Sequence, residues 1–268
     1  SGADQLLFYN PALGNGAAKW IPLDGSLASA VTPLGEGIVV PLTIGQVFYL
    51  SAADGSKLAT PFQPMLEPQK EWQYKPAGGV EGGEPRFVIA DGQGKIYFVT
   101  LVDQPQPHLK ATTQADTGPH PIESPLIVLG DSVMAIGGSS HLLRFKLPSL
   151  EPSGDSNQAA PVVWGPFRVG DAMLLATANN QLMAIASDGQ IKWQSATEHG
   201  DLAGAPLLQS DSILIAYKKG IIERRSLADG KPLAAKDLEQ PLASGLVSFL
   251  QRLVIAANDG TLLVVDQP

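Results

Sequence analysis

The stretch Gly260-Thr-Leu-Leu-Val-Val-Asp266 decides the fold, because six other segments repeat its pattern at a nearly constant interval. Steps of 40 residues lead back to copies that start at residues 220, 180 and 140, and steps of 46, 49 and 41 then reach copies at 94, 45 and 4. The third position is aliphatic in all seven copies: Leu6, Val47, Ile96, Leu142, Leu182, Ile222 and Leu262. A period near 40 with β-forming residues in every unit predicts the blades of a β-propeller rather than a helical array.

Two further elements precede the repeat strand in most units. A continuous apolar run, such as Ile38-Val-Val or Met173-Leu-Leu, lies in front of six of the seven copies, as expected of a strand covered on both faces. Upstream of each run is a residue that we interpret as lying on a crowded innermost strand, where backbones converge. These residues are Ala30, Gly79, Pro125, Gly165, Ala205 and Gly245. Each unit is therefore predicted to be a four-stranded antiparallel sheet, with strands a to d from the inside outward.

We predict one all-β domain over residues 1–268, a propeller of six blades, with seven as the alternative. The units cover about 24–64, 76–114, 121–158, 160–198, 201–240 and 241–268, with 4–23 in addition. Segments near 64–84 and 103–121, rich in Pro, Gly and Gln, are expected to be surface-loop insertions. The last unit stops before its fourth strand. The strand at 17–23, which follows an Asn15-Gly16 turn, is therefore expected to complete that blade and close the ring.

The composition excludes several classes of function. No run approaches the roughly 20 apolar residues that a transmembrane helix needs, so we expect a soluble, monomeric domain without a membrane span. The net charge of -8 disfavours a nucleic-acid partner, because such proteins usually present a basic face. The chain has no cysteine, which excludes disulfides, a thiolate nucleophile and cysteine-ligated zinc.

The segments Gly260–Asp266 and Asn180–Trp193 resemble the repeat of quinoprotein-like (PQQ-like) propellers, which reads Gly-x-Leu-x-Ala-Leu-Asp, a short turn and then Gly-x-x-x-Trp. The resemblance covers most of the chain, but the closing Trp is present only as Trp20 and Trp193. One branch of that family consists of dehydrogenases that hold PQQ and calcium over the central axis, with a catalytic Asp and often an adjacent Cys pair on a longer, usually eight-bladed chain. The other is the BamB-type branch, in which the propeller is a non-catalytic docking surface. This shorter chain without Cys is nearer to the second.

No motif identifies a catalytic or metal site. The histidines His108, His120, His141 and His199 do not stand in HxH, HxxxH or HExxH spacing, so we assign them to loops or exposed strands and predict no metal ligands. Asp54-Gly-Ser56 and Asp91-Gly-Gln-Gly94 are interpreted as hairpin turns rather than calcium loops. GxSxG, P-loop and Rossmann fingerprints are absent from the sequence, so no catalytic residue is named.

The tips of the b–c hairpins are the predicted binding face, because the repeat brings them together around the axis. We expect a protein or peptide partner there, since polar loop tips on a rigid scaffold suit an adaptable surface. The alternative is that they are ordinary polar turns. The candidate residues are Asn179, Asn180, Lys218, Lys219, Asn258 and Asp259, together with His199 from a d–a loop.

Trp164 occupies a strand-a position where other units have small residues, so its ring is expected in or beside the central channel. It would fill that channel or line a ligand site, and the first interpretation needs no ligand. Arg144, Arg224 and Arg225 interrupt the apolar pattern of two c strands. They are interpreted as a charged exterior, with an anionic peptide or ligand on that side as the alternative.

These observations predict a non-catalytic binding or scaffold module that mediates protein–protein interaction, as part of a larger or envelope-associated protein. The family resemblance implies a periplasmic or other extracytoplasmic location. We expect no cofactor, with PQQ kept as the alternative. Two other functions stay open: a quinoprotein-like oxidoreductase, and a sensor that binds a small molecule or carbohydrate at the central channel.

Overall fold

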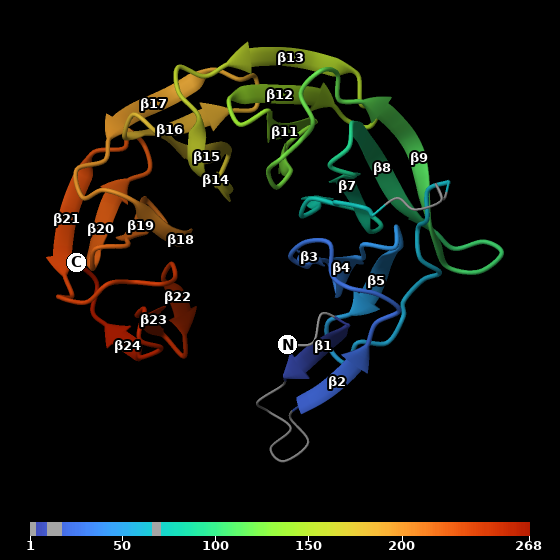
Figure 1. Cartoon of the computed structure of the whole chain (residues 1–268), viewed down its shortest axis with the longest axis horizontal. Helices are drawn as coiled ribbons and strands as arrows, with labels where there is room; N and C mark the ends of the chain where they lie inside the picture. Colours follow the sequence, from blue (N-terminus) through green and yellow to red (C-terminus); the bar gives the residue numbers. More distant parts are fainter. Residues whose placement is uncertain (1–3, 10–17, 66–70) are drawn as a thin grey trace. The chain divides into compact units, whose positions relative to one another are not determined.

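The computed structural model describes residues 4–9, 18–65 and 71–268, so the predicted Asn15-Gly16 turn lies outside the described residues. The chain divides into two compact units, residues 1–157 and 158–268, which are described in turn. The regular secondary structure of the described residues consists of β-strands. Within each sheet, every strand pairs with the strands next to it in the sequence (Figure 1).

The N-terminal unit contains four antiparallel sheets among its described residues. The first is the pair β1 (Gln5–Tyr9) and β2 (Ala18–Pro22). The second has β3 (Thr32–Leu34), β4 (Gly37–Pro41) and β5 (Val47–Ser51). The third has β6 (Gly78–Val80), β7 (Arg86–Ala90), β8 (Lys95–Val102) and β9 (His108–Asp116). The fourth has β10 (Ile127–Leu129), β11 (Ser132–Gly137), β12 (His141–Lys146) and β13 (Pro152–Asn157).

The C-terminal unit contains three antiparallel sheets. One has β14 (Val162–Val169), β15 (Ala172–Thr177), β16 (Gln181–Ala186) and β17 (Ile191–Ala196). The next has β18 (Leu202–Leu208), β19 (Ser212–Tyr217), β20 (Ile221–Ser226) and β21 (Pro232–Asp237). The last has β22 (Val247–Phe249), β23 (Arg252–Ala256) and β24 (Leu262–Val265).

The predicted apolar runs are the second strands of the sheets, and three of them are completely buried. Every residue of β11, β15 and β19 is buried. Side chains that alternate along such a strand point to opposite faces, so complete burial requires a covering layer on each side. The interpretation of these runs as doubly covered strands is confirmed for β11, β15 and β19, whereas β23 in the last sheet is only partly buried.

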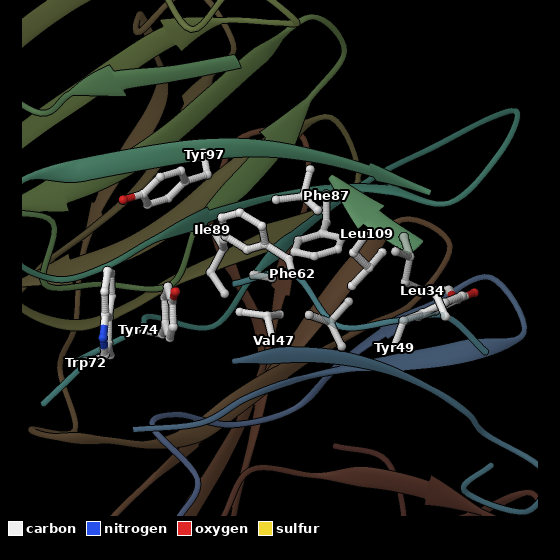
Figure 2. Packing of buried hydrophobic residues seen from close by; sticks show 14 residues of the cluster. Leu34, Val47, Tyr49, Phe62, Trp72, Tyr74, Phe87, Ile89, Tyr97 and Leu109 are labelled. Atoms are coloured by element: carbon white, nitrogen blue, oxygen red, sulfur yellow. The ribbon is translucent and has the colours of Figure 1, made fainter. Parts of the chain in front are cut away.

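The cores lie between consecutive sheets of each unit. In the N-terminal unit, Val47 and Tyr49 from β5 pack in one cluster with Phe87 and Ile89 from β7, and Figure 2 shows these side chains converging. In the C-terminal unit, a cluster joins residues of β15 and β16 to residues of β19. Sheets that stack face to face in this way bury both faces of their middle strands, which is the packing expected of successive blades.

Residues 71–77 correct the expectation of a featureless surface loop over 64–84. Trp72 and Tyr74 are buried and stack with ring centroids 5.5 Å apart (Figure 2). The Tyr74 hydroxyl donates a hydrogen bond of 3.1 Å to the carbonyl of Gly45. Likewise, the expected loop at 103–121 contains the nine-residue strand β9. The Pro- and Gly-rich composition of both segments concealed these parts of the fold.

The strand expected to close the ring has a partner within the N-terminal unit. β2 runs antiparallel to β1 over five residue pairs, from Gln5 opposite Pro22 to Tyr9 opposite Ala18. The β22–β23–β24 sheet has three strands among the described residues. The predicted pairing of residues 17–23 with the last strand would join the two units, and it stays a prediction.

Close backbone approaches explain the small residues of the innermost strands. A Cβ added to Gly78 would lie 2.8 Å from the carbonyl oxygen of Leu126, which directly precedes β10 of the following sheet. In the C-terminal unit, a Cβ on Gly245 would lie 2.0 Å from the carbonyl oxygen of Ala205. These distances are too short for any side chain, so the backbones of neighbouring sheets touch only because glycine is present.

Two adjacent glycines of β6 provide a matched test of this crowding. Gly78→Ala should lower the free energy of unfolding by about 2 kcal/mol or more, because the new methyl group meets a backbone carbonyl that cannot move aside. Gly79→Ala should stay within about 1 kcal/mol of wild type, since its Cβ would meet the Leu34 side chain at 3.1 Å and the Pro33 carbonyl oxygen at an ordinary contact distance of 3.8 Å. Urea unfolding of both variants checks the difference, and equal costs would contradict the crowding.

Candidate functional site

A cavity of about 360 Å³ opens in the C-terminal unit, and three of the predicted site residues line it. Trp164, Asn180 and Lys218 reach it from β14, the β15–β16 hairpin tip and the β19–β20 hairpin tip. Gly200 and Asp201, on the connection between β17 and β18, complete one side. Residues separated by more than 50 positions in sequence therefore meet at one opening.

Trp164 is fixed in place by its surroundings. Its indole Nε1 donates a hydrogen bond of 2.7 Å to the carbonyl of Gly204 on β18. Its ring packs against Phe167 with centroids 4.7 Å apart and an interplanar angle of 55°. The ring is half-buried and lines the cavity, and its role as a ligand contact stays a prediction. A held aromatic ring with one accessible side is a preorganised contact for a ligand.

Asn180 forms the tip of its hairpin in a backbone conformation that few residue types adopt. Its φ of 59° lies in the left-handed region, where asparagine is enriched. The Asn180 N–H donates to the Thr177 carbonyl at 3.0 Å, and the Asn180 carbonyl accepts from the Thr197 N–H at 2.9 Å. The neighbouring Asn179 side chain accepts a 2.6 Å hydrogen bond from the Thr177 hydroxyl. The backbone of this tip is therefore held on both sides.

Lys218 and Asp201 place opposite charges at the cavity. Their side chains are 3.6 Å apart and largely exposed, at 61% and 80%. The backbone also connects them, because the Lys218 N–H donates to the Asp201 carbonyl at 2.8 Å. An exposed ion pair of this kind contributes little to stability. The ion pair can therefore separate at a small cost in free energy, so that each charged group can pair with a group of a bound partner.

The remaining predicted residues of this face lie outside the cavity. Lys219, Asn258 and Asp259 are exposed on hairpin tips, and His199 is half-buried with its ring edge-on to Tyr217 at 5.0 Å. A hydrogen bond from the Thr261 N–H holds the pKa of Asp259 below its usual range. Backbone hydrogen bonds connect the tips to the intervening loops, as from Leu242 N–H to the Lys218 carbonyl and from Asn258 N–H to the Pro241 carbonyl. The tips and loops thus form one linked row.

The structure contradicts the assignment of Arg225 to a charged exterior. Its side chain is 1% exposed, and its guanidinium donates to the Glu223 carboxylate at 2.8 Å, to the Ser195 hydroxyl at 2.8 Å and to the Ala196 carbonyl at 2.9 Å. The Tyr217 hydroxyl donates to the same Glu223 carboxylate at 2.5 Å. This buried network connects β20 to β17 of the neighbouring sheet. A charged residue in a c strand serves here as an internal link between sheets.

Arg144 and Arg224 are half-buried residues in different units. Arg144 donates a 3.2 Å hydrogen bond to the Ser153 carbonyl on the adjacent strand. Its guanidinium also occupies the space that a Cβ on Gly154 would need. The proposal that these arginines bind an anion on that side stays untested, but Arg225 is not available for it.

A second cavity of the C-terminal unit, about 740 Å³, was not predicted. It lies at the β18–β19 and β22–β23 turns, with Leu208, Gln251 and Val264 among its lining residues. Antiparallel strands place these turns at the end opposite the b–c hairpin tips. No residue of the predicted binding face lines this cavity.

Solved structures similar to this chain are β-propellers. BamB from Moraxella catarrhalis has a TM-score of 0.64 at 15% identity, with 98% of this chain and 78% of that chain covered. BBS1N in complex with ARL6DN has a TM-score of 0.67 at 13% identity, with 98% and 87% covered. The computationally designed Ika8 protein has a TM-score of 0.67 at 13% identity, with 94% and 75% covered.

This chain has a β-propeller fold. The all-β architecture of four-stranded antiparallel sheets confirms the predicted fold class, and six or seven blades fit it. No family model and no curated protein matches the sequence. Among the described residues, no helix is long and apolar enough to span a membrane.

The buried network predicts a large cost for removing its cation. Arg225→Ala should lower the free energy of unfolding by about 3–5 kcal/mol, because Glu223 would remain buried without its partner. Lys192→Ala removes an exposed ion pair with Asp171 and should cost at most about 1 kcal/mol. Denaturant unfolding of both variants measures the contrast, and a cost below about 1 kcal/mol for Arg225→Ala would contradict the role of the network.

The same network predicts alkaline sensitivity. Burial first, and then the hydrogen bond to Glu223, raises the pKa of the Tyr217 hydroxyl in the folded chain. The stability that this provides is fully present below the unfolded pKa of about 10 and is lost as pH rises further, toward the folded pKa. Unfolding measured from pH 8 to 11 should show a decline above about pH 10 that is smaller in Tyr217→Phe. An identical alkaline decline in the variant would contradict this.

Proposed function

We propose that this chain is a non-catalytic propeller module that binds a segment of a protein partner at the cavity lined by Trp164, Asn180 and Lys218. The observation that supports it best is the convergence of these residues, predicted independently from the repeat, at one opening. Protein-binding loops on a rigid scaffold are a common use of such folds. One neighbour in fold, BBS1N, was solved in complex with ARL6DN.

The chemistry of the opening favours a peptide-like ligand. The indole ring of Trp164 offers an apolar surface of the kind that dominates protein interfaces. Lys218 and Asp201 provide one cation and one anion, and the hairpin tips add polar side chains. An aromatic anchor surrounded by polar and charged groups is the usual anatomy of a protein interface. The volume is sufficient for one or two side chains of the partner.

Affinity capture with matched variants tests this function. Proteins of the native host recovered by the wild-type chain should be lost with Trp164→Ala, because truncation of a central aromatic anchor typically costs 2 kcal/mol or more, about 30-fold in affinity. Lys218→Ala should weaken capture less, with an effect that shrinks at high salt. Lys192 is an exposed lysine of another ion pair, so Lys192→Ala is the control and should capture the same proteins as wild type.

The alternatives give different outcomes in the same preparation. A partner retained equally by wild type and Trp164→Ala would contradict the proposed site. Saturable, stoichiometric binding of PQQ with calcium would favour the oxidoreductase. A rise in melting temperature with a sugar or small molecule, lost in Trp164→Ala, would favour the sensor, because a ligand that binds only the folded state stabilises it.

A further inference from the structure

The three side chains of His120, His141 and Asp155 form a cluster in the N-terminal unit. Each offers one potential ligand atom, and these atoms all lie within 4.8 Å of one another. His120 lies on the connection between β9 and β10, His141 begins β12, and Asp155 lies on β13. The cluster is thus distinct from the cavity of the C-terminal unit.

The sheet register brings His141 and Asp155 together. His141 pairs with Asn157 across β12 and β13, so Asp155, two positions away, is its diagonal neighbour on the same face. The His141 Nδ1 and the Asp155 Oδ1 are 2.8 Å apart. Their side chains are 23% and 47% exposed, so an ion from solvent can reach them.

Two glycines at the β11–β12 tip allow His120 to lie over His141. The two imidazole rings stack with centroids 3.5 Å apart and an interplanar angle of 14°. A Cβ on Gly137 would lie 2.7 Å from the His120 carbonyl oxygen, and a Cβ on Gly138 would lie 3.2 Å from His120 Nδ1. Any larger residue at Gly137 would displace the segment that carries His120.

Backbone hydrogen bonds hold the segment around His120 on both sides. The Thr117 N–H donates to the Gly94 carbonyl at 2.8 Å, and the Gly138 N–H donates to the Pro121 carbonyl at 3.3 Å. The position of His120 is therefore set by the fold, while its ring remains half-buried at the surface. A specific metal site requires ligands whose positions are fixed by the surrounding structure. Here three separate segments carry the ligands, and backbone contacts hold the segment of His120.

We propose that His120, His141 and Asp155 bind a divalent transition-metal ion, with zinc as the best match. Two imidazole nitrogens and one carboxylate oxygen are borderline ligands that suit Zn²⁺, and three protein ligands leave one position for water. Ligand atoms around tetrahedral zinc are about 3.3 Å apart, given bonds of about 2.0–2.1 Å. Side-chain rotations that separate the stacked rings and bring the ligand atoms, which lie within 4.8 Å of one another, to this spacing complete the site.

Calorimetric titration of ZnCl₂ into the untagged full chain at pH 7.5 tests the site. Wild type should bind one equivalent, and His120→Ala and His141→Ala should each weaken binding at least about tenfold. His108→Ala is the matched control, because His108 contacts the Gln106 carbonyl and is not part of the cluster. Asp155→Asn should also weaken zinc binding, since the amide is a poorer ligand than the carboxylate.

Cobalt absorption, measured together with circular dichroism, distinguishes loss of the metal site from loss of folding. Co²⁺ bound by wild type and by His108→Ala should show the visible absorption of a four-coordinate site, which the double variant His120→Ala/His141→Ala should lose while its circular dichroism stays that of the wild type. No saturable zinc binding by wild type would overturn the proposal. Equal zinc affinity in wild type and the double variant would overturn it as well.

Discussion

Burial of the second strand on both faces is the constraint on which the rest of this structure depends. A strand such as β15 or β19 contributes apolar side chains alternately to two cores, so it is stable only when a sheet lies on each side of it. That requirement orders the sheets in series within each unit. It also places every b–c hairpin tip at one end of the strands and every a–b turn at the other. The candidate binding residues share a location because of this packing.

Most of the fold could be predicted from the repeat, because the repeated apolar positions are the ones that must be buried between sheets. The aliphatic third position and the apolar run before it are the two strands that the cores bury, and their spacing gives the sheet order. What escaped prediction has no periodic signal. Trp72 and Tyr74 fill the core from a segment with loop-like composition. Arg225 has the sequence pattern of a surface residue and instead pairs with Glu223 inside.

The candidate site was predictable in part for the same reason. Asn180 and Lys218 occupy equivalent hairpin tips one repeat apart, and Trp164 departs from the small residues found at its position in other units. The contribution of Gly200 and Asp201 to one shared opening needed the structure. The His120–His141–Asp155 cluster was not predicted, because its spacing follows the geometry of one sheet rather than a local ligand motif. The pair Gly137-Gly138, which admits His120, was the available sequence signal.

The central claim is that the chain binds a protein segment through the Trp164 cavity, and hydrogen–deuterium exchange of the complex with a captured partner tests it most directly. The account predicts slower exchange in the segments that surround the opening, residues 162–164, 177–180, 197–202 and 217–219, with little change at the opposite turns near 209–211 and 249–252. Protection confined to those opposite turns, or to the N-terminal unit, would contradict it.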